Sequence, residues 1–367
     1  MNKRGGEMNE NKISTKHYII FIYAATFISL KIYCSLFISI GGRDTWICLA
    51  AAFITLIIFS IYILNIISSR GIYNINEIFT IGLSKPIGNI LLFLFSIGLF
   101  LSSLEATMVE ANCINTCFFV ATPEWYIIFF FLFPSLFLIG KRVRTILIFS
   151  TVNVAAFILN SIILNIFSEP YKNTEYILPV FGNNLTISNY LNCFLLLLGS
   201  ISAFAISLPY LNQLTKAKDL KKHSLITLCI IGLYCVYSII GVLSCFGPLR
   251  ASNLFYPEFV MSQRIELGGF IEFGELFFLF QTVIGLFLKY LLSTYGIYII
   301  YRKLIKNYKA YITIYTLIVF VISSLLSKNN YNLFKFLKYY NYSNLLLLLL
   351  IPLIAYTAFA MKSKKKA

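Results

Sequence analysis

Four ionisable side chains lie inside stretches that are otherwise strongly apolar. They are Lys31 in 18–40, Glu105 and Glu110 in 87–119, and Lys289 in 270–301. A charge near the middle of a bilayer costs ~3 kcal/mol or more, so such residues usually face a bundle interior or a wet cavity. A lysine there can hold an anionic group, and a glutamate can hold a cationic one. Lys31, Glu105 and Lys289 are therefore candidate binding residues, while Glu110 lies further out along its segment.

Lys31 and Glu105 carry opposite charges near the middle of their segments. Each alone would be a buried unpaired charge, so we expect the two to face each other. Two interpretations remain open: a structural ion pair that orients two helices, or two side chains that line one polar cavity. Lys289 lies toward the cytoplasmic half of its segment, where its ammonium either reaches the membrane interface or joins this cavity.

Small and polar residues interrupt the same apolar stretches. Such residues satisfy backbone groups where a membrane helix is broken, although they also let helices pack closely. Pro209 follows one of these groups, in the sixth segment. The complete set of candidate ligand-binding residues is Thr26, Ser29, Lys31, Glu105, Gly199, Ser200, Ser202 and Lys289.

The composition indicates an all-α integral membrane protein. Of its 367 residues, 59% are hydrophobic and only 12% are charged, and the apolar runs are continuous, unlike the alternating pattern of barrel strands. We predict a cytoplasmic N-terminal tail over 1–16, a permease-like domain over 17–361 and a basic cytoplasmic tail over 362–367. The domain is expected to hold ten transmembrane helices, at 17–40, 46–68, 87–119, 125–140, 145–167, 190–214, 224–246, 270–301, 310–327 and 343–361.

The positive charges predict the orientation of these helices. Of the 30 Lys and Arg residues, 21 fall on one side of the predicted membrane and 7 on the other, while Lys31 and Lys289 lie within spans. Cytoplasmic loops carry the excess of positive charge, so both termini should be cytoplasmic. Ten spans with this orientation allow a 5+5 inverted repeat, in which helices 1 and 6 are broken and the substrate binds near the midplane.

The sequence offers no sign of an enzyme. It contains no Gly-rich phosphate loop, no G-x-S-x-G elbow and no zinc-ligand helix. Cys113 and Cys117 share a helix face, but no histidine pair or second cysteine pair completes a metal site. We therefore expect no catalytic residue, no metal and no cofactor. The net charge of +16 is explained by topology and anionic lipid, without nucleic acid.

Four stretches carry a family resemblance. They are Ile13-Ser14 at the start, G-R-D-T-W-I at 42–47, T-P-E-W at 122–125, and the segment from Tyr256-Pro257 through R-I-E-L-G-G-F-I-E, which ends at Glu272. In order and spacing the chain resembles the B subunit of spore nutrient germinant receptors, the endospore germination permeases. These belong to the amino acid/polyamine/organocation transporter superfamily. The chain departs from the family pattern in its first helix, which lacks the usual glycine and L-P pair.

The resemblance implies the LeuT-like fold and a germinant-sensing role in the spore inner membrane. The protein would bind an amino acid or similar nutrient in a mid-membrane pocket. The buried charges themselves, apart from the resemblance, suggest that Lys31 meets the carboxylate of such a ligand and Glu105 its ammonium, unless the two only pair with each other. The protein would act with a germinant receptor A subunit and a lipoprotein C subunit. Residues 256–272 would lie outside the membrane, away from the pocket, and shape a gate or a subunit contact. The alternatives are an ion-coupled amino acid transporter and, more remotely, a membrane scaffold with a vestigial pocket.

Overall fold

The computed structural model describes residues 14–26, 28–139, 141–181, 185–214, 219–267 and 271–364. Most of the predicted N-terminal tail, 1–13, and the last residues of the basic tail, 365–367, lie outside the described residues, as do 268–270 of the family-like segment. The first half of the chain forms α2 (Thr15–Thr26), α3 (Ile28–Ile32), α4 (Ser35–Gly41), η1 (Gly42–Asp44), α5 (Thr45–Arg70), α6 (Ile75–Gly82), α7 (Lys85–Cys117), α8 (Glu124–Leu132), α9 (Ser135–Leu138), α10 (Val143–Ser168), η2 (Glu169–Tyr171) and η3 (Thr174–Ile177).

The second half is also helical apart from one short hairpin. It forms α11 (Ile187–Ile201), η4 (Ser202–Gln213), α12 (Leu220–Asn253), α13 (Pro257–Ser262), β1 (Glu266–Leu267), β2 (Ile271–Glu272), α14 (Gly274–Tyr301), α15 (Tyr308–Leu326), α16 (Asn330–Asn344), η5 (Leu345–Leu350) and α17 (Ile351–Lys364). The two strands pair antiparallel, with Glu266 opposite Glu272 and Leu267 opposite Ile271.

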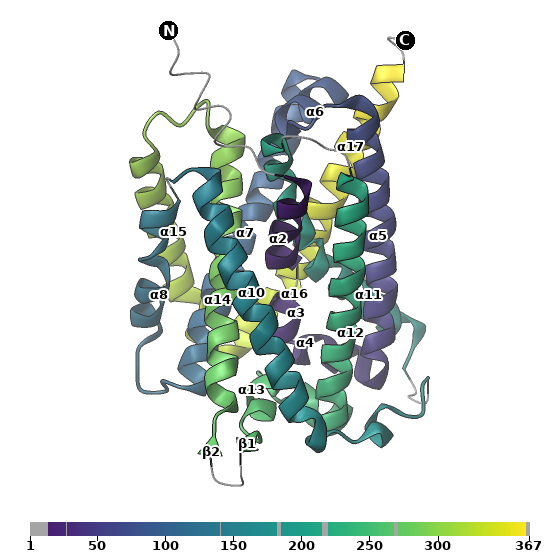
Figure 1. Ribbon diagram of the computed structural model, residues 1–367, viewed down its shortest axis with the longest axis vertical. Helices are drawn as coiled ribbons and strands as arrows, with labels where there is room; N and C mark the ends of the chain where they lie inside the picture. The colour runs from purple at the N-terminus through teal and green to yellow at the C-terminus, as the bar shows by residue number, and fades with distance from the viewer. Residues whose placement is uncertain are drawn as a thin grey trace.

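The long helices run along the long axis of the molecule and form one bundle (Figure 1). Within the described residues, eight helical stretches are long and apolar enough to cross a membrane. Large apolar side chains such as Ile58, Phe137 and Ile166 are more than half exposed on their outer surfaces. Helices that are apolar outside as well as inside are typical of membrane spans. The predicted class, an integral membrane protein of α-helices, is confirmed.

Several predicted spans differ from the helices that form. The first is divided among α2, α3 and α4, and the fourth forms only the short apolar stretch Glu124–Leu138. The last begins earlier than predicted, because α16 starts at Asn330 and continues through η5 into α17. The sequence of α16 is too polar to be recognised as part of a span, yet its Asn341 and Asn344 are fully buried. The count of ten spans and the inverted repeat stay predictions.

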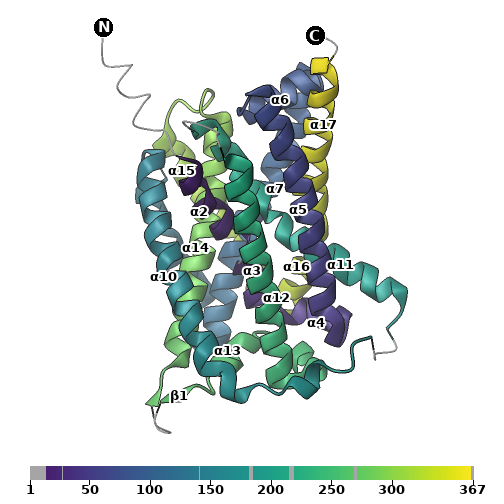
Figure 2. The same cartoon turned by 45° about the vertical axis from the view of Figure 1, so that its right-hand side comes forward.

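The first membrane segment is interrupted, and its pieces follow one another down the middle of the bundle (Figures 1 and 2). Tyr33 and Cys34 form a turn between α3 and α4. Neither glycine nor proline causes this turn. Buried side chains in and beside it bind other elements instead, as when Ser35 Oγ donates to the Phe255 carbonyl at 2.9 Å. Such tertiary contacts compensate for the helical hydrogen bonds that are lost where the helix is interrupted.

The sixth segment changes its helical type instead of unwinding. The α-helix α11 ends at Ile201, and the 12-residue 3₁₀ helix η4 follows, with Pro209 inside it. Runs of 3₁₀ helix longer than three or four residues are uncommon and often mark hinges. Gly199 has a packing role here, because a Cβ atom added to it would lie 1.9 Å from the Asn341 carbonyl oxygen. Its absent side chain lets α11 approach α16.

Candidate functional site

A buried ion pair joins α14 to α7 in the interior of the bundle. Lys289 Nζ lies 2.8 Å from Glu105 Oε2, and both side chains are 0% exposed. Glu105 belongs to the middle of α7 and Lys289 to the middle of α14. The suggestion that Lys289 reaches the membrane interface is therefore wrong. Two side chains with no access to water remain charged only because the attraction between their opposite charges offsets the loss of hydration.

This pair is bound directly to the interrupted part of the first segment. Lys289 Nζ donates a hydrogen bond to Ser29 Oγ, just before the turn. The hydroxyl of Tyr33, in the turn itself, donates to Glu105 Oε1 at 2.9 Å. Lys289 Nζ also lies 5.5 Å from the centre of the Tyr340 ring, which α16 contributes. The first segment, α7, α14 and α16 thus meet at a single pair of charges.

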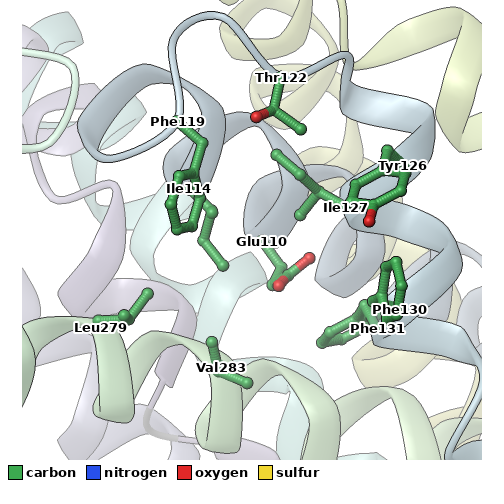
Figure 3. Close-up of a pocket in the computed structure, with 10 residues that line it drawn as sticks. All are labelled: Glu110, Ile114, Phe119, Thr122, Tyr126, Ile127, Phe130, Phe131, Leu279 and Val283. Atoms are coloured by element: carbon green, nitrogen blue, oxygen red, sulfur yellow. The ribbon is translucent and has the colours of Figure 1, made fainter.

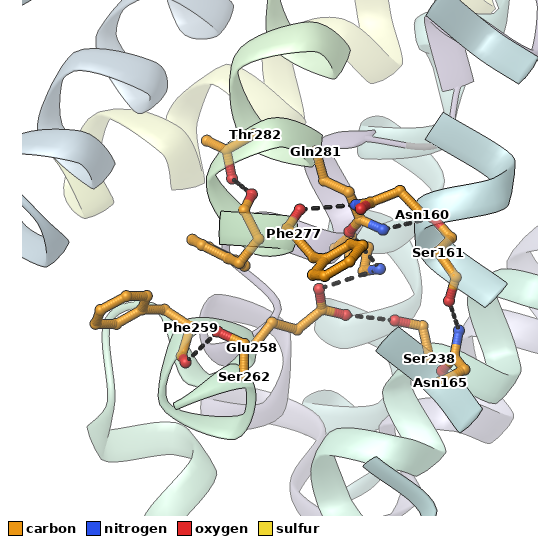
Figure 4. Close-up of polar contacts among 12 residues, drawn as sticks. Asn160, Ser161, Asn165, Ser238, Glu258, Phe259, Ser262, Phe277, Gln281 and Thr282 are labelled. Carbon is orange, nitrogen blue, oxygen red and sulfur yellow. Dashed lines mark hydrogen bonds and ion pairs between the residues drawn. The ribbon is translucent and has the colours of Figure 1, made fainter. Parts of the chain in front are cut away.

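Lys31 forms a second buried cluster, whose partners Glu258, Gln281, Ser238 and Ser161 are labelled in Figure 4. Its Nζ donates to Gln281 Oε1 at 2.7 Å and lies 3.5 Å from Glu258 Oε2. The other Glu258 oxygen accepts a hydrogen bond from Ser238 at 2.6 Å, and Gln281 Nε2 donates to Ser161 Oγ at 2.7 Å. The helices α10, α12, α13 and α14 all contribute to this network.

The predicted pairing of Lys31 with Glu105 is wrong. Ser29 and Lys31 are two residues apart, and successive helical residues turn by about 100°, so their side chains leave α3 on nearly opposite sides. Ser29 therefore meets the Lys289 pair, while Lys31 meets Glu258. The expectation that residues 256–272 lie away from the central charges is also wrong, because Glu258 is only 3% exposed and reaches inward to Lys31.

Sequence reasoning missed Glu258, Gln281 and Tyr33. One signal for a second carboxylate was present, since two lysines within spans each require a counter-ion. Glu105 supplies one, and the other had to come from a less apolar segment. The sequence held no comparable signal for Tyr33 or Gln281, because buried tyrosines and glutamines are ordinary in such helices.

The remaining candidates do not join either ion pair. Thr26 Oγ1 donates back to the Ile22 carbonyl at 2.8 Å, and Ser202 Oγ donates to the Gly199 carbonyl. Ser200 Oγ is buried without a hydrogen-bond partner. Within the described residues, no hydrogen bond or ion pair connects Gly199, Ser200 or Ser202 with the two lysines. Four cavities within the described residues likewise have neither ion pair in their walls.

Three of the four family-like stretches occupy structural junctions, where one element gives way to the next. In the G-R-D stretch, Asp44 accepts hydrogen bonds from the Tyr190 hydroxyl at 2.6 Å and from the Phe181 amide at 3.1 Å. Arg43 donates to the Leu178 carbonyl. The T-P-E-W stretch begins α8, and Tyr256-Pro257 begins α13. These residues connect the long helices with their loops and position the elements around the charges.

A sequence model of the family described as spore germination protein matches residues 12–332. The chain belongs to this family. The matched region runs from just before α2 into α16 and contains both ion pairs. The family resemblance drawn from the sequence is confirmed, and membership assigns the chain a germination-related membrane permease role in a transporter- and receptor-type family. No curated protein sequence matches the chain.

Proposed function

We propose that the protein is a germinant-sensing membrane subunit of a spore nutrient receptor and that it binds an amino acid at the Lys289–Glu105 pair. The contact of this pair with Ser29 and Tyr33 carries the proposal. A zwitterionic amino acid presents one carboxylate and one ammonium, the two charges that Lys289 and Glu105 hold for each other. Such an amino acid gives Lys289 a new carboxylate and Glu105 a new ammonium at the same time, so no buried charge is left unpaired.

The proposal assigns the carboxylate to Lys289, in place of the Lys31 expected from sequence. The ammonium of the ligand then takes the place of Lys289 beside Glu105. The Tyr33 hydroxyl is still able to donate its hydrogen bond to the Glu105 carboxylate. The two charged groups now lie 2.8 Å apart, so binding must separate α14 from α7. Because Ser29 and Tyr33 hold the same two groups, the turn in the first segment moves with them. That movement is the proposed signal.

The α13 helix is the proposed outer gate. Glu258 on α13 reaches Lys31 on α3 and Ser238 on α12, so α13 is tied to the same segment that senses the ligand. Movement of α3 therefore pulls on α13. Arg264, after α13, has its guanidinium 4.7 Å from the centre of the Phe246 ring. This contact holds the following hairpin against α12.

The assembly and location follow from the same proposal. The subunit would lie in the spore inner membrane with both termini cytoplasmic and act with an A subunit and a lipoprotein C subunit. The positive-charge bias of the loops supports the orientation. Family membership supports the germination role, and the A and C subunits are the partners that a receptor of this kind requires.

Germination of spores that carry single variants tests the site. A charge-assisted hydrogen bond contributes about 1.5–3 kcal/mol, so Lys289→Met and Glu105→Gln should each raise the amino acid concentration for half-maximal germination by about tenfold or more. The protein level, measured by immunoblot, should stay sufficient for a response. Lys172→Met is the control, since Lys172 pairs with Glu169 at 2.6 Å in an outer loop, and it should leave the concentration unchanged.

Two results would contradict the proposed site. If each single change only lowers the protein level and the double change restores both level and response, the pair is structural. If labelled amino acid accumulates inside vesicles that contain the purified chain, and does so against its gradient with an ion, the protein is an ion-coupled transporter. Saturable binding without accumulation is the result expected for a receptor subunit.

A further inference from the structure

The Glu110 carboxylate is buried without a cation. Glu110 is 3% exposed, and its Oε2 has no hydrogen-bond partner. The ion pairs of the described residues join other carboxylates. A carboxylate in a membrane-spanning helix is costly unless a positive group meets it. Lys289 and Lys31 are already paired with Glu105 and Glu258, so neither lysine neutralises Glu110.

Glu110 points into a cavity of about 430 Å³ (Figure 3). The cavity lies between α7, α8 and α14, and volumes of 300–1,000 Å³ are usual for small-molecule sites. Apart from the Glu110 carboxylate, the Thr122 hydroxyl and the Tyr126 hydroxyl, its wall is made of apolar side chains. They are Ile114, Phe119, Ile127, Phe130, Phe131, Leu279 and Val283, together with the rings and methyl groups of the residues just named.

The mouth of this cavity is apolar. Tyr126 and Phe130 of α8 are 47% and 57% exposed, and Phe119, in the connection that precedes α8, is 52% exposed. Phe129 of α8 and Phe133, which follows it, are exposed as well. In a membrane protein such a surface faces lipid chains. A ligand therefore enters from the bilayer, with an apolar body at the mouth and its polar end toward Glu110.

We propose that this cavity binds an amphiphilic ammonium cation, a protonated primary amine on an aromatic or branched apolar body. The ammonium supplies the positive charge that Glu110 lacks and donates hydrogen bonds to its oxygens. The aromatic rings of the wall attract a cation through their faces and bury its apolar body. An anionic or purely apolar ligand leaves the carboxylate unpaired and binds more weakly.

The test uses the purified full-length chain in phospholipid nanodiscs, with empty nanodiscs correcting for partition into lipid. The probe is radiolabelled 4-phenylbutylamine, and the competitor is 4-phenylbutanol, which has the same body without the charge. We expect saturable binding of the amine and competition by the alcohol that is at least tenfold weaker. Glu110→Gln should weaken amine binding by about tenfold or more, the effect of losing a charged hydrogen bond.

Two further variants keep the result decisive. Glu124→Gln removes a nearby carboxylate that does not line the cavity and should leave amine binding unchanged. Val283→Trp fills the cavity while keeping Glu110 and should abolish saturable binding, even if Glu110→Gln fails to accumulate. Equal affinity for the amine and the alcohol, or unchanged amine binding in Glu110→Gln, would overturn the proposal and identify Glu110 as an uncharged acid in an apolar cleft.

Discussion

Among the residues that the structure describes, each buried lysine has its own carboxylate, and the two pairs lie on opposite sides of one short helix. Lys289 meets Glu105, and Lys31 meets Glu258. Breaking a buried pair by removing one partner costs about 3–5 kcal/mol, while replacing both partners by apolar groups is often neutral. The pairing can therefore be read from the stability of single and double variants.

The pairing of Lys31 predicts a specific double-mutant cycle. Lys31→Met and Glu258→Gln should each lower the thermal stability of the purified protein, and the double variant should recover most of the loss. Lys31→Met combined with Glu105→Gln should show no such recovery, because those residues do not touch. Recovery in this second cycle and additivity in the first would mean that the lysines exchange carboxylates.

Tyr33 offers a finer probe of the proposed ligand site. Tyr33→Phe removes only the hydroxyl that donates to Glu105 at 2.9 Å. Leaving the buried Glu105 carboxylate without this hydrogen-bond donor costs about 1–3 kcal/mol of free energy. We therefore expect the amino acid concentration for half-maximal germination to rise by roughly 5- to 100-fold. Tyr18→Phe is the matched control, since its hydroxyl bonds Ser207 at 2.8 Å, outside both ion pairs. An equal shift in both variants would show a general loss of packing.

At the level of elements, the sequence predicted most spans but not how their side chains meet. The length of the continuous apolar runs located α5, α7, α10, α14 and α15, because a membrane helix needs about 20 apolar residues whatever it contacts. Lys31, Glu105 and Lys289 were recognisable as buried charges for the same reason. Their partners depend on helix rotation and on the inward position of α13, which no local pattern in the sequence records.

The contact between α11 and α16 depends on Gly199. A Cβ atom there would meet the Asn341 backbone at 1.9 Å, and backbone cannot move aside as a flexible side chain does. Gly199→Ala should therefore lower the melting temperature or the protein level strongly. Gly296→Ala is the control, because its Cβ would lie 3.6 Å from Leu99, and it should be tolerated. A stable Gly199→Ala protein would show that α11 and α16 are further apart.

At the scale of the whole molecule, the predicted orientation places the two ends of the bundle in different compartments. The end that carries the α14–α15 connection lies opposite the β1–β2 hairpin and η3 (Figure 1). Lys306 and Glu175 are exposed on these opposite ends. The excess of positive charge on the first end predicts that it is cytoplasmic.

Cysteine labelling tests this orientation directly. In a Cys229→Ser background, which removes the exposed native cysteine, Glu175→Cys should react with a membrane-impermeant maleimide added outside intact cells. Lys306→Cys should react only after the membrane is permeabilised. The reverse pattern would place both termini outside, and Glu258 and α13 would then close the bundle toward the cytoplasm. A nutrient arriving from outside would meet the Lys289–Glu105 pair without passing the proposed gate, so this single measurement decides whether α13 is able to control access.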